Sequence, residues 1–305
     1  MPSRRDFLAA SATLAVGLSC LGLSGPGFAS SHLMLTRKVP ASGEALAVIG
    51  AGTSGSFEVE ADSAQYQQLK QVLKVFFDGG GQVIDTSPNY GGADAVLGQL
   101  LEEGGWRGQT FLATKIAADS RAAAEAQWAA TLRNLRTDKV DLLQIHNLRD
   151  WQRQLPYARE LKAQGLTRYV GVTHYTDSGL ETLEGILRNE QLDFIQIHYS
   201  VNSPAAAHTV LPLAQDKGVA VLINRAFDDG RLFAKVKGQA LPAWAQEAGI
   251  GSWAQLFLKF AISHPAVTAV IPATSRPDRQ FDQLKAGSGP LLSDVQRKQL
   301  IEQFA

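Results

Sequence analysis

The chain has 305 residues, enough for one large domain or two small ones. Its 29 basic and 29 acidic side chains balance to a formal net charge of zero, which removes any general electrostatic reason to bind nucleic acid or an anionic membrane. Cys20 is the single cysteine, and no Cys/His cluster has metal-ligand spacing, so the sequence predicts no metal site.

The first 29 residues have the layout of an export signal. Two arginines in Ser3-Arg-Arg-Asp-Phe-Leu8 precede an apolar run over 7–23, and Gly27-Phe28-Ala29 forms a small-x-small cleavage site. The arginine pair matches the twin-arginine (Tat) pattern. We therefore expect export by the Tat translocase to the periplasm, cleavage after Ala29 and no stable membrane insertion afterwards; an uncleaved signal anchor is the alternative. Cys20 would leave with the signal, so the mature chain, 30–305, would have no disulfide.

The mature chain begins with a predicted hairpin and then repeats one pattern. Residues 35–44 are typical of a hairpin, with Pro40-Ala-Ser-Gly43 as its turn. Short apolar runs follow at intervals, rich in β-branched residues as strands buried on both faces are. There are eight of these runs: 47–50, 83–85, 110–115, 140–146, 169–172, 194–198, 219–223 and 267–271.

Helical patterns lie between the runs. They cover 63–78, 93–103, 120–135, 151–164, 177–189, 204–216, 252–263 and a segment from Pro277, with a further helix at 293–304. Strands that alternate with helices are parallel, and eight repeats over about 250 residues predict an α/β fold, a (β/α)8 TIM barrel. The short N-terminal hairpin and the C-terminal helix are additions to it. The alternative is a doubly wound open sheet, but no Gly-x-Gly-x-x-Gly follows the first run.

Several predicted strands end in polar residues, and a barrel has its active site at the carboxyl ends of its strands. The second, third and fourth strands end in Asp85, Lys115 and His146, and Tyr90 follows Asp85 in the adjoining loop. Taken singly, each is more often a solvated charge or a core residue than a catalytic group. As a set they suit proton transfer, because an ammonium favours the phenolate of a tyrosine, a carboxylate holds the ammonium, and a histidine orients a carbonyl oxygen.

These motifs resemble those of the aldo-keto reductases over essentially the whole mature chain. The similarity rests on Asp-Thr-Ser-Pro-x-Tyr at 85–90, Thr-Lys ending at 115, Leu-Leu-Gln-Ile-His ending at 146 and Ile-Pro-Ala-Thr-Ser-Arg-Pro at 271–277. The resemblance implies an NAD(P)H-dependent enzyme that reduces an aldehyde or ketone to an alcohol, and a monomer. It implies that Tyr90 donates the proton, that Lys115 paired with Asp85 tunes it, and that His146 positions the substrate oxygen.

The resemblance also implies an extended nicotinamide cofactor on the barrel itself, but this chain departs from the family there. The family has Ser-Asn where this chain has Thr173-His174, and a stacking aromatic residue where it has Asn224, which leaves Phe227 as a candidate replacement. Cofactor contacts are expected from Thr53, Asp85, Thr173, His174, Gln196, Asn224, Arg225, Phe227, Thr274, Ser275, Arg279 and Gln283.

Cofactor preference depends on the segment after the eighth strand. The family often has a lysine where this chain has Ala273, but a guanidinium can also clamp a phosphate. Arg279, assisted by Arg276, therefore favours NADP(H), with NAD(H) as the alternative.

Two other functions stay open. A non-catalytic module that senses nucleotide or binds an envelope partner is motivated by His174 and Asn224, and a dehydrogenase working in the oxidative direction would use the same residues.

Overall fold

The computed structural model describes residues 33–61 and 63–304. The export signal, its cleavage site and Cys20 lie outside the described residues. Within 33–61 and 63–304, no helix combines the length and the apolar character that crossing a membrane would need.

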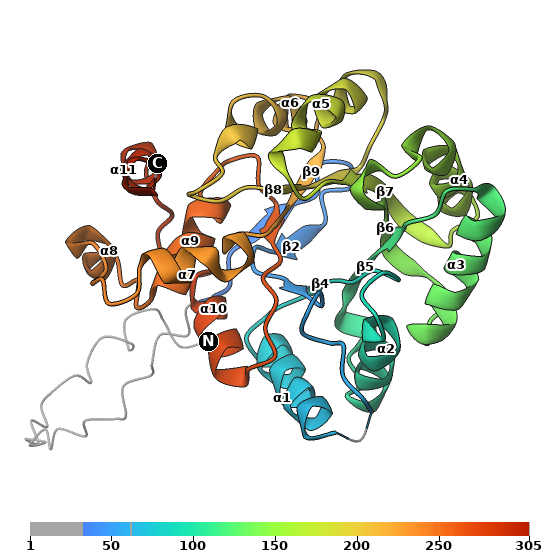
Figure 1. The fold of residues 1–305 in the computed structure, drawn as a ribbon, viewed down its shortest axis with the longest axis horizontal. Coiled ribbons are helices and arrows are strands. Elements are labelled where there is room, and N and C mark those ends of the chain that lie inside the picture. The colour runs from blue at the N-terminus through green and yellow to red at the C-terminus, as the bar shows by residue number, and fades with distance from the viewer. Residues whose placement is uncertain (1–32, 62, 305) are drawn as a thin grey trace, which may run out of the picture. The chain divides into compact units, whose positions relative to one another are not determined.

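The core of the structure is a sheet of eight parallel strands in chain order, each hydrogen-bonded to the next. Figure 1 shows the strands at the centre and the helices around them. The predicted (β/α)8 barrel is confirmed. The strands are β3 (Ala51–Gly52), β4 (Val83–Asp85), β5 (Phe111–Ile116), β6 (Val140–Ile145), β7 (Thr167–Thr173), β8 (Phe194–His198), β9 (Ala220–Asn224) and β10 (Ala269–Val270).

The barrel closes at a seam between its first and last strands. Parallel bridges join Ile49 to Val270 and Gly52 to Ala273. The Gly50 amide donates to the Val270 carbonyl at 2.8 Å. A Cβ atom on Gly50 would lie only 2.8 Å from the Val83 carbonyl oxygen, so the close approach requires a glycine here.

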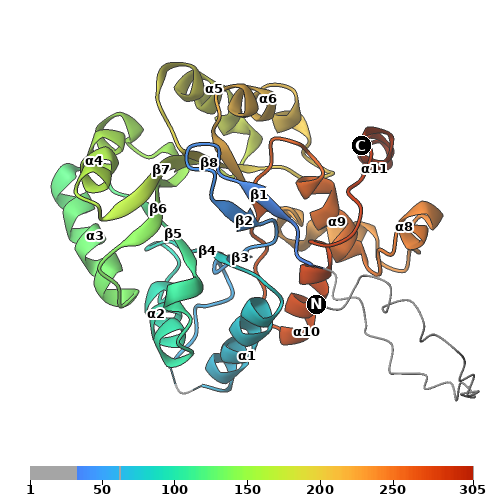
Figure 2. The same ribbon diagram turned by 180° about the vertical axis from the view of Figure 1, so that it is seen from behind.

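The N-terminal hairpin is present, with strands β1 (Thr36–Lys38) and β2 (Ala45–Ala47) paired antiparallel. The predicted bounds of the first barrel strand, 47–50, were partly wrong: Ala47 pairs with Thr36 in the hairpin, and β3 itself is Ala51–Gly52, although Ile49 and Gly50 already bond to Val270 of the last strand. Figure 2, which shows the molecule from behind relative to Figure 1, has the hairpin across the centre of the barrel. Its Val39 and Leu46 pack on side chains from the barrel strands, so the hairpin plugs the end of the barrel where the strands begin.

The predicted helices after the first six strands are all present as α1 to α6, and three of the helices in the fold start at serine caps. Ser63, Ser120 and Ser252 each accept from an amide three residues on, which satisfies a donor that the helix leaves free. The helices are α1 (Ala64–Asp78), α2 (Ala93–Glu103), α3 (Arg121–Asn134), α4 (Trp151–Ala163), α5 (Leu180–Asn189), α6 (Val210–Asp216), α9 (Trp253–Ile262), α10 (Pro277–Lys285) and the additional α11 (Asp294–Phe304).

Two short helices between β9 and α9 were not predicted from the sequence. They are α7 (Arg231–Lys235) and α8 (Ala243–Glu247), each of five residues. A segment of five residues is too short to display the periodicity of a helix. This long connection lies at the ends of the strands where the candidate site is found.

Candidate active site

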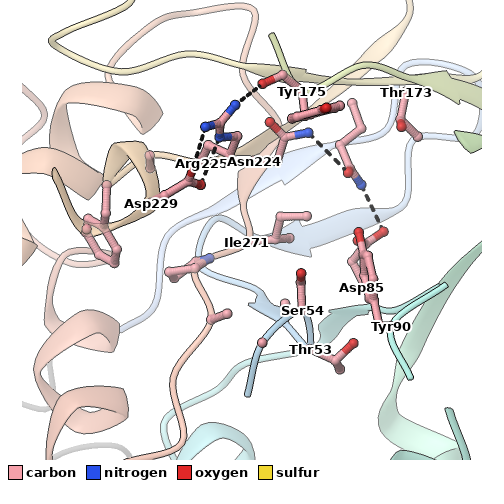
Figure 3. Close-up of a pocket in the computed structure, with 18 of the residues that line it drawn as sticks. Thr53, Ser54, Asp85, Tyr90, Thr173, Tyr175, Asn224, Arg225, Asp229 and Ile271 are labelled. Carbon is pink, nitrogen blue, oxygen red and sulfur yellow. Dashed lines mark hydrogen bonds and ion pairs between the residues drawn. The ribbon is translucent and has the colours of Figure 1, made fainter. Parts of the chain in front are cut away.

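A cavity of about 860 Å³ opens at the carboxyl ends of the barrel strands. Asp85, Tyr90 and His146 line it, and Figure 3 shows Asp85 and Tyr90 together beside it. Lys115 lies in the barrel wall and is 1% exposed. The structure therefore brings together the four residues that the strand ends singled out.

Asp85 and Lys115 form a buried ion pair. The Lys115 ammonium donates to Asp85 Oδ1 at 2.5 Å and to the Thr86 carbonyl at 2.8 Å. Burial alone would lower the pKa of Lys115, but Asp85 and Tyr90 outweigh it and hold that pKa above its ordinary value. Lys115 is therefore a fixed positive charge next to the cavity.

The second oxygen of Asp85 accepts from two amides. Gln196 Nε2 lies 2.8 Å and Gln144 Nε2 3.0 Å from Asp85 Oδ2. Gln144 was missed in the sequence analysis; its only signal was a polar side chain within the apolar run that forms β6. The two amides fix the orientation of the carboxylate that holds Lys115.

Tyr90 lies between Lys115 and His146. Its ring meets the His146 ring edge-on, with centroids 5.7 Å apart, and the Lys115 ammonium is 5.1 Å from its centroid. Burial raises the pKa of Tyr90, Lys115 lowers it and Asp85 raises it, so that the pKa stays above its ordinary value. Lys115 thus lowers the pKa of Tyr90, as the sequence suggested, but burial of the phenol raises it by more.

His146 is held neutral. Burial and the charge of Lys115 lower its pKa to about 3. Its Nδ1 lies 3.0 Å from the hydroxyl of Ser87, which was also missed although it lies within the 85–90 motif. With Nδ1 so engaged, Nε2 is the ring nitrogen left for a ligand.

Most residues predicted to bind the cofactor line this cavity or a second one of about 410 Å³. His174 and Ser275 line neither of them: the His174 Nδ1 lies 3.1 Å from the Thr176 carbonyl, and the Ser275 carbonyl accepts from Gln68. The main cavity is lined by Thr53, Asp85, Thr173, Gln196, Asn224, Arg225, Phe227 and Arg279, and the second by Phe227, Thr274, Arg279 and Gln283.

Asn224 extends the polar network from Asp85 into the cavity (Figure 3). Its Nδ2 donates to Gln196 Oε1 at 3.3 Å and to the His174 carbonyl at 3.2 Å. Its Oδ1 is buried and has no hydrogen-bond partner among the described residues. A buried acceptor without a partner is costly, so a ligand that donates a hydrogen bond fits this position.

Part of the lining of the cavity was not predicted from the sequence. Arg225 donates to the Tyr175 carbonyl at 2.7 Å and pairs with Asp229, and both contacts are drawn in Figure 3. Tyr175 is 47% exposed and lines the cavity. Phe233, on the unpredicted α7, lines both cavities. These two aromatic side chains had no sequence signal beyond their residue type.

Among the residues that the structure describes, no group of three or more His, Cys, Asp or Glu side chains has the arrangement of a metal site.

Comparisons of the sequence with known proteins found a matching family and several relatives. A profile described as the aldo/keto reductase family matches residues 48–302. Aldo-keto reductase YhdN of Bacillus subtilis (strain 168) is 28% identical over 181 residues, 54% of each chain. The NADH-specific methylglyoxal reductase of Escherichia coli (strain K12) is 24% identical over 198 residues, 55% of this chain and 59% of that one. The chain thus spans little more than half the length of these curated relatives.

Solved structures match over more of the chain. An aldo/keto reductase from Klebsiella pneumoniae in complex with NADP and acetate is 26% identical with a TM-score of 0.72, and the match covers 86% of this chain and 93% of that one. An aldo-keto reductase from Klebsiella pneumoniae in complex with NADPH is 25% identical with a TM-score of 0.74, covering 89% and 96%.

Proposed function

The chain belongs to the aldo/keto reductase family, and from that membership we propose that it reduces an aldehyde or ketone to an alcohol at the expense of NADPH, with Tyr90 as the general acid. The observation that carries the proposal is the meeting of Asp85, Lys115, Tyr90 and His146 at one cavity. Each of these groups has a distinct part in delivering one proton to a carbonyl oxygen.

Tyr90 holds the proton that the reduced oxygen requires. Because burial raises its pKa, the phenol stays protonated at neutral pH. The positive charge of Lys115 stabilises the phenolate that remains after the proton has moved. Asp85, whose carboxylate accepts from the amides of Gln144 and Gln196, keeps that ammonium in place.

His146 orients the carbonyl. A histidine with a pKa of about 3 is neutral, so it can donate one hydrogen bond to the substrate oxygen without competing with Tyr90 as an acid. If Nδ1 carries the proton, it donates to the Ser87 hydroxyl. If Nε2 carries the proton, the Ser87 hydroxyl donates to Nδ1 instead. The mechanism requires this second tautomer, because Nε2 can then donate to the substrate oxygen.

The described residues fit a nicotinamide cofactor, which supplies the hydride when bound. The unpartnered Asn224 Oδ1 would accept from a carboxamide N–H, and the buried hydroxyl of Thr173 lines the same cavity. Tyr175 and Phe227 bring aromatic surface to this cavity, where the family's stacking residue is replaced by Asn224. Arg279 lines both cavities and suits a phosphate group.

NADPH is the favoured form of the cofactor. The structural relatives from Klebsiella pneumoniae are complexes with NADP or NADPH, whereas the relative from Escherichia coli is called NADH-specific. Arg276 pairs with Asp278, which leaves Arg279 as the better candidate for a 2′-phosphate. NADH stays the alternative.

The experiment compares wild type with Tyr90→Phe. Wild type should oxidise NADPH with a reactive aldehyde, and the variant should lose about 100-fold or more of that rate, the usual contribution of a general acid. NADPH binding, followed by tryptophan fluorescence, should be unchanged. Equal rates for the two proteins would rule out Tyr90 as the acid.

A nucleotide-sensing or partner-binding module is the second candidate. The replacement of family residues at His174 and Asn224 favours it. Tight NADPH binding without turnover on a broad panel of aldehydes and ketones would support this candidate against the reductase.

We further propose that residues 1–29 are a Tat signal and that the mature protein, 30–305, acts in the periplasm as a monomer. Replacing Arg4 and Arg5 with lysine should keep the precursor in the cytoplasm, as fractionation would reveal. Processing that is unaffected by the replacement would contradict Tat export.

A further inference from the structure

A buried carboxyl group that interacts electrostatically with the Lys115 ammonium has no part in the proposed mechanism. It belongs to Asp94, in the first turn of α2, which is 3% exposed. Burying a carboxyl group is costly unless it is paired or hydrogen-bonded. Its position next to the charged pair therefore calls for an explanation.

Asp94 ends a chain of three hydrogen-bonding side chains that starts at the cavity. The Thr53 hydroxyl, which lines the cavity, donates to the Thr86 hydroxyl at 2.9 Å. The Thr86 hydroxyl in turn donates to Asp94 Oδ1 at 2.6 Å. All three residues are buried, and Thr86 cannot rotate about χ1 without breaking both bonds.

Thr86 is also in direct contact with the catalytic lysine. Its carbonyl oxygen accepts from the Lys115 ammonium at 2.8 Å, and Asp85 Oδ1 accepts from the same ammonium at 2.5 Å. Whatever fixes Thr86 therefore fixes one of the supports of Lys115.

Asp94 also contributes a charge. Burial raises the pKa of Asp94, the Thr86 hydroxyl and Lys115 lower it, Asp85 raises it, and the hydroxyl of Thr131 on α3 lowers it. In its ionised form Asp94 raises the pKa of Tyr90, as Asp85 does. The second oxygen of Asp94, Oδ2, has no well-formed hydrogen bond among the described residues.

We propose that Asp94 is a positioning residue for the reaction: it anchors Thr86, whose carbonyl holds Lys115 against Tyr90. The inference rests on the proposed role of Tyr90 as the acid. Asp94 itself touches neither the cavity nor the reacting atoms.

Two substitutions separate the anchor from the charge. Asp94→Asn keeps the shape and an acceptor for Thr86 but removes the charge, so the pKa of Tyr90 should fall. Thr86→Val, added to Asp94→Asn so that the Asp94 charge is already absent, keeps the shape but breaks the anchor, so Lys115 loses a support and the pKa of Tyr90 should rise relative to Asp94→Asn alone. The two substitutions therefore shift one measured quantity in opposite directions.

The measurement is an NMR titration of protein labelled at tyrosine Cζ, with the Tyr90 signal assigned from Tyr90→Phe. It needs neither substrate nor turnover, so it gives an answer even if the proposed reductase activity fails. Opposite shifts support the inference. Shifts in the same direction, or no shift from either substitution, overturn it.

Kinetics with a reactive aldehyde give the second readout. Thr86→Val should lower kcat about tenfold, equivalent to about 1.4 kcal/mol in the barrier, with KM little changed, and Thr86→Ser should restore it. Glu102→Gln, at an exposed site on the same helix, is the matched control and should behave as wild type. A Thr86→Val enzyme with wild-type kcat would contradict the anchoring role, whereas an inactive wild type would contradict only the proposed function.

Discussion

At the scale of residues, three donors converge on the Asp85 carboxylate, and Asp85 supplies the negative charge that is paired with Lys115. Lys115 donates to one oxygen, and Gln144 and Gln196 donate to the other. In a buried pair, the attraction between the charges is offset by the cost of removing both from water, and the pair is stable only while it is complete.

Asp85→Asn should destabilise the protein markedly. The substitution removes the carboxylate that is paired with the buried Lys115 ammonium, a loss that typically costs about 3–5 kcal/mol. Urea unfolding would measure the loss. The paired substitution of Asp85 and Lys115 by Asn and Met removes both charges and should recover part of the stability, so a double variant that is less stable than Asp85→Asn would contradict this explanation.

Arg279 should distinguish the two forms of the cofactor. If it binds a 2′-phosphate, Arg279→Ala should weaken NADPH binding about tenfold or more, since a charge-assisted hydrogen bond contributes about 1.5–3 kcal/mol. NADH binding should change little. Arg276→Ala is the control, because Arg276 is already paired with Asp278. Calorimetric titration with both nucleotides would test this, and equal losses for NADPH and NADH would exclude a phosphate contact.

Site residues at the ends of strands could be predicted from the sequence, whereas site residues in turns and loops were partly missed. Asp85, Lys115 and His146 each end an apolar run, so parallel strands had to bring them to one end of the barrel. Ser87 gave no such signal, because serine is common in turns for local reasons. Whether a residue such as His174 turns toward the cavity depends on side-chain packing that a motif does not encode.

At the scale of elements, the hairpin and the connection after β9 give the barrel two different ends. The hairpin of β1 and β2 closes the end where the strands begin, and α7 contributes Phe233 to the opposite end. The alternation of strands and helices predicted the barrel. The helices α7 and α8 were too short to be predicted from periodicity. Ala47 belongs to the hairpin and not to the barrel, because it pairs with Thr36. Such pairings depend on tertiary contacts.

Tyr169→Phe should loosen the hairpin. The Tyr169 hydroxyl lies 2.6 Å from Ser42 Oγ and 2.8 Å from Glu44 Oε2, so its removal should lower the free energy of unfolding by about 1–2 kcal/mol. Urea denaturation measures the change. Glu184→Ala removes only the pair with Arg188 on the surface of α5, and such an exposed pair contributes little, typically below about 0.5 kcal/mol. Comparable losses in the two variants would argue against a special role of the hairpin.

At the scale of the whole molecule, three buried histidines of the described residues, His146, His198 and His264, make the fold sensitive to acid, because burial lowers the pKa of each. Burial lowers the pKa of His146 to about 3 and that of His264 to about 4, against an ordinary value near 6.5. Between pH 6.5 and those values, the unfolded chain binds protons that the folded chain does not. The free energy of unfolding should therefore decrease as the pH falls from 6.5 toward 4.

His264→Gln should reduce that dependence on pH. The substitution removes one of the groups that must be kept neutral, so the loss of stability between pH 6.5 and 4.5 should be smaller than in wild type. Thermal unfolding across this range would measure it, with the exposed His208→Gln as the control. A slope identical to that of wild type would mean that His264 takes no part in acid unfolding.

The seam between Ile49 and Val270 sets an order of events during synthesis. Val270 follows Ile49 by about 220 residues, which a ribosome adds in on the order of 10–40 s. The cavity has Gly52 and Thr53 on one side of this seam and Pro272 and Ala273 on the other, so it is complete only after nearly the whole chain has emerged. Under the proposed function, a nucleotide bound there would contact both sides and oppose reopening of the seam, because a ligand that binds only the folded state stabilises it. The supply of nucleotide at the place of synthesis would thus help to determine how many new chains survive.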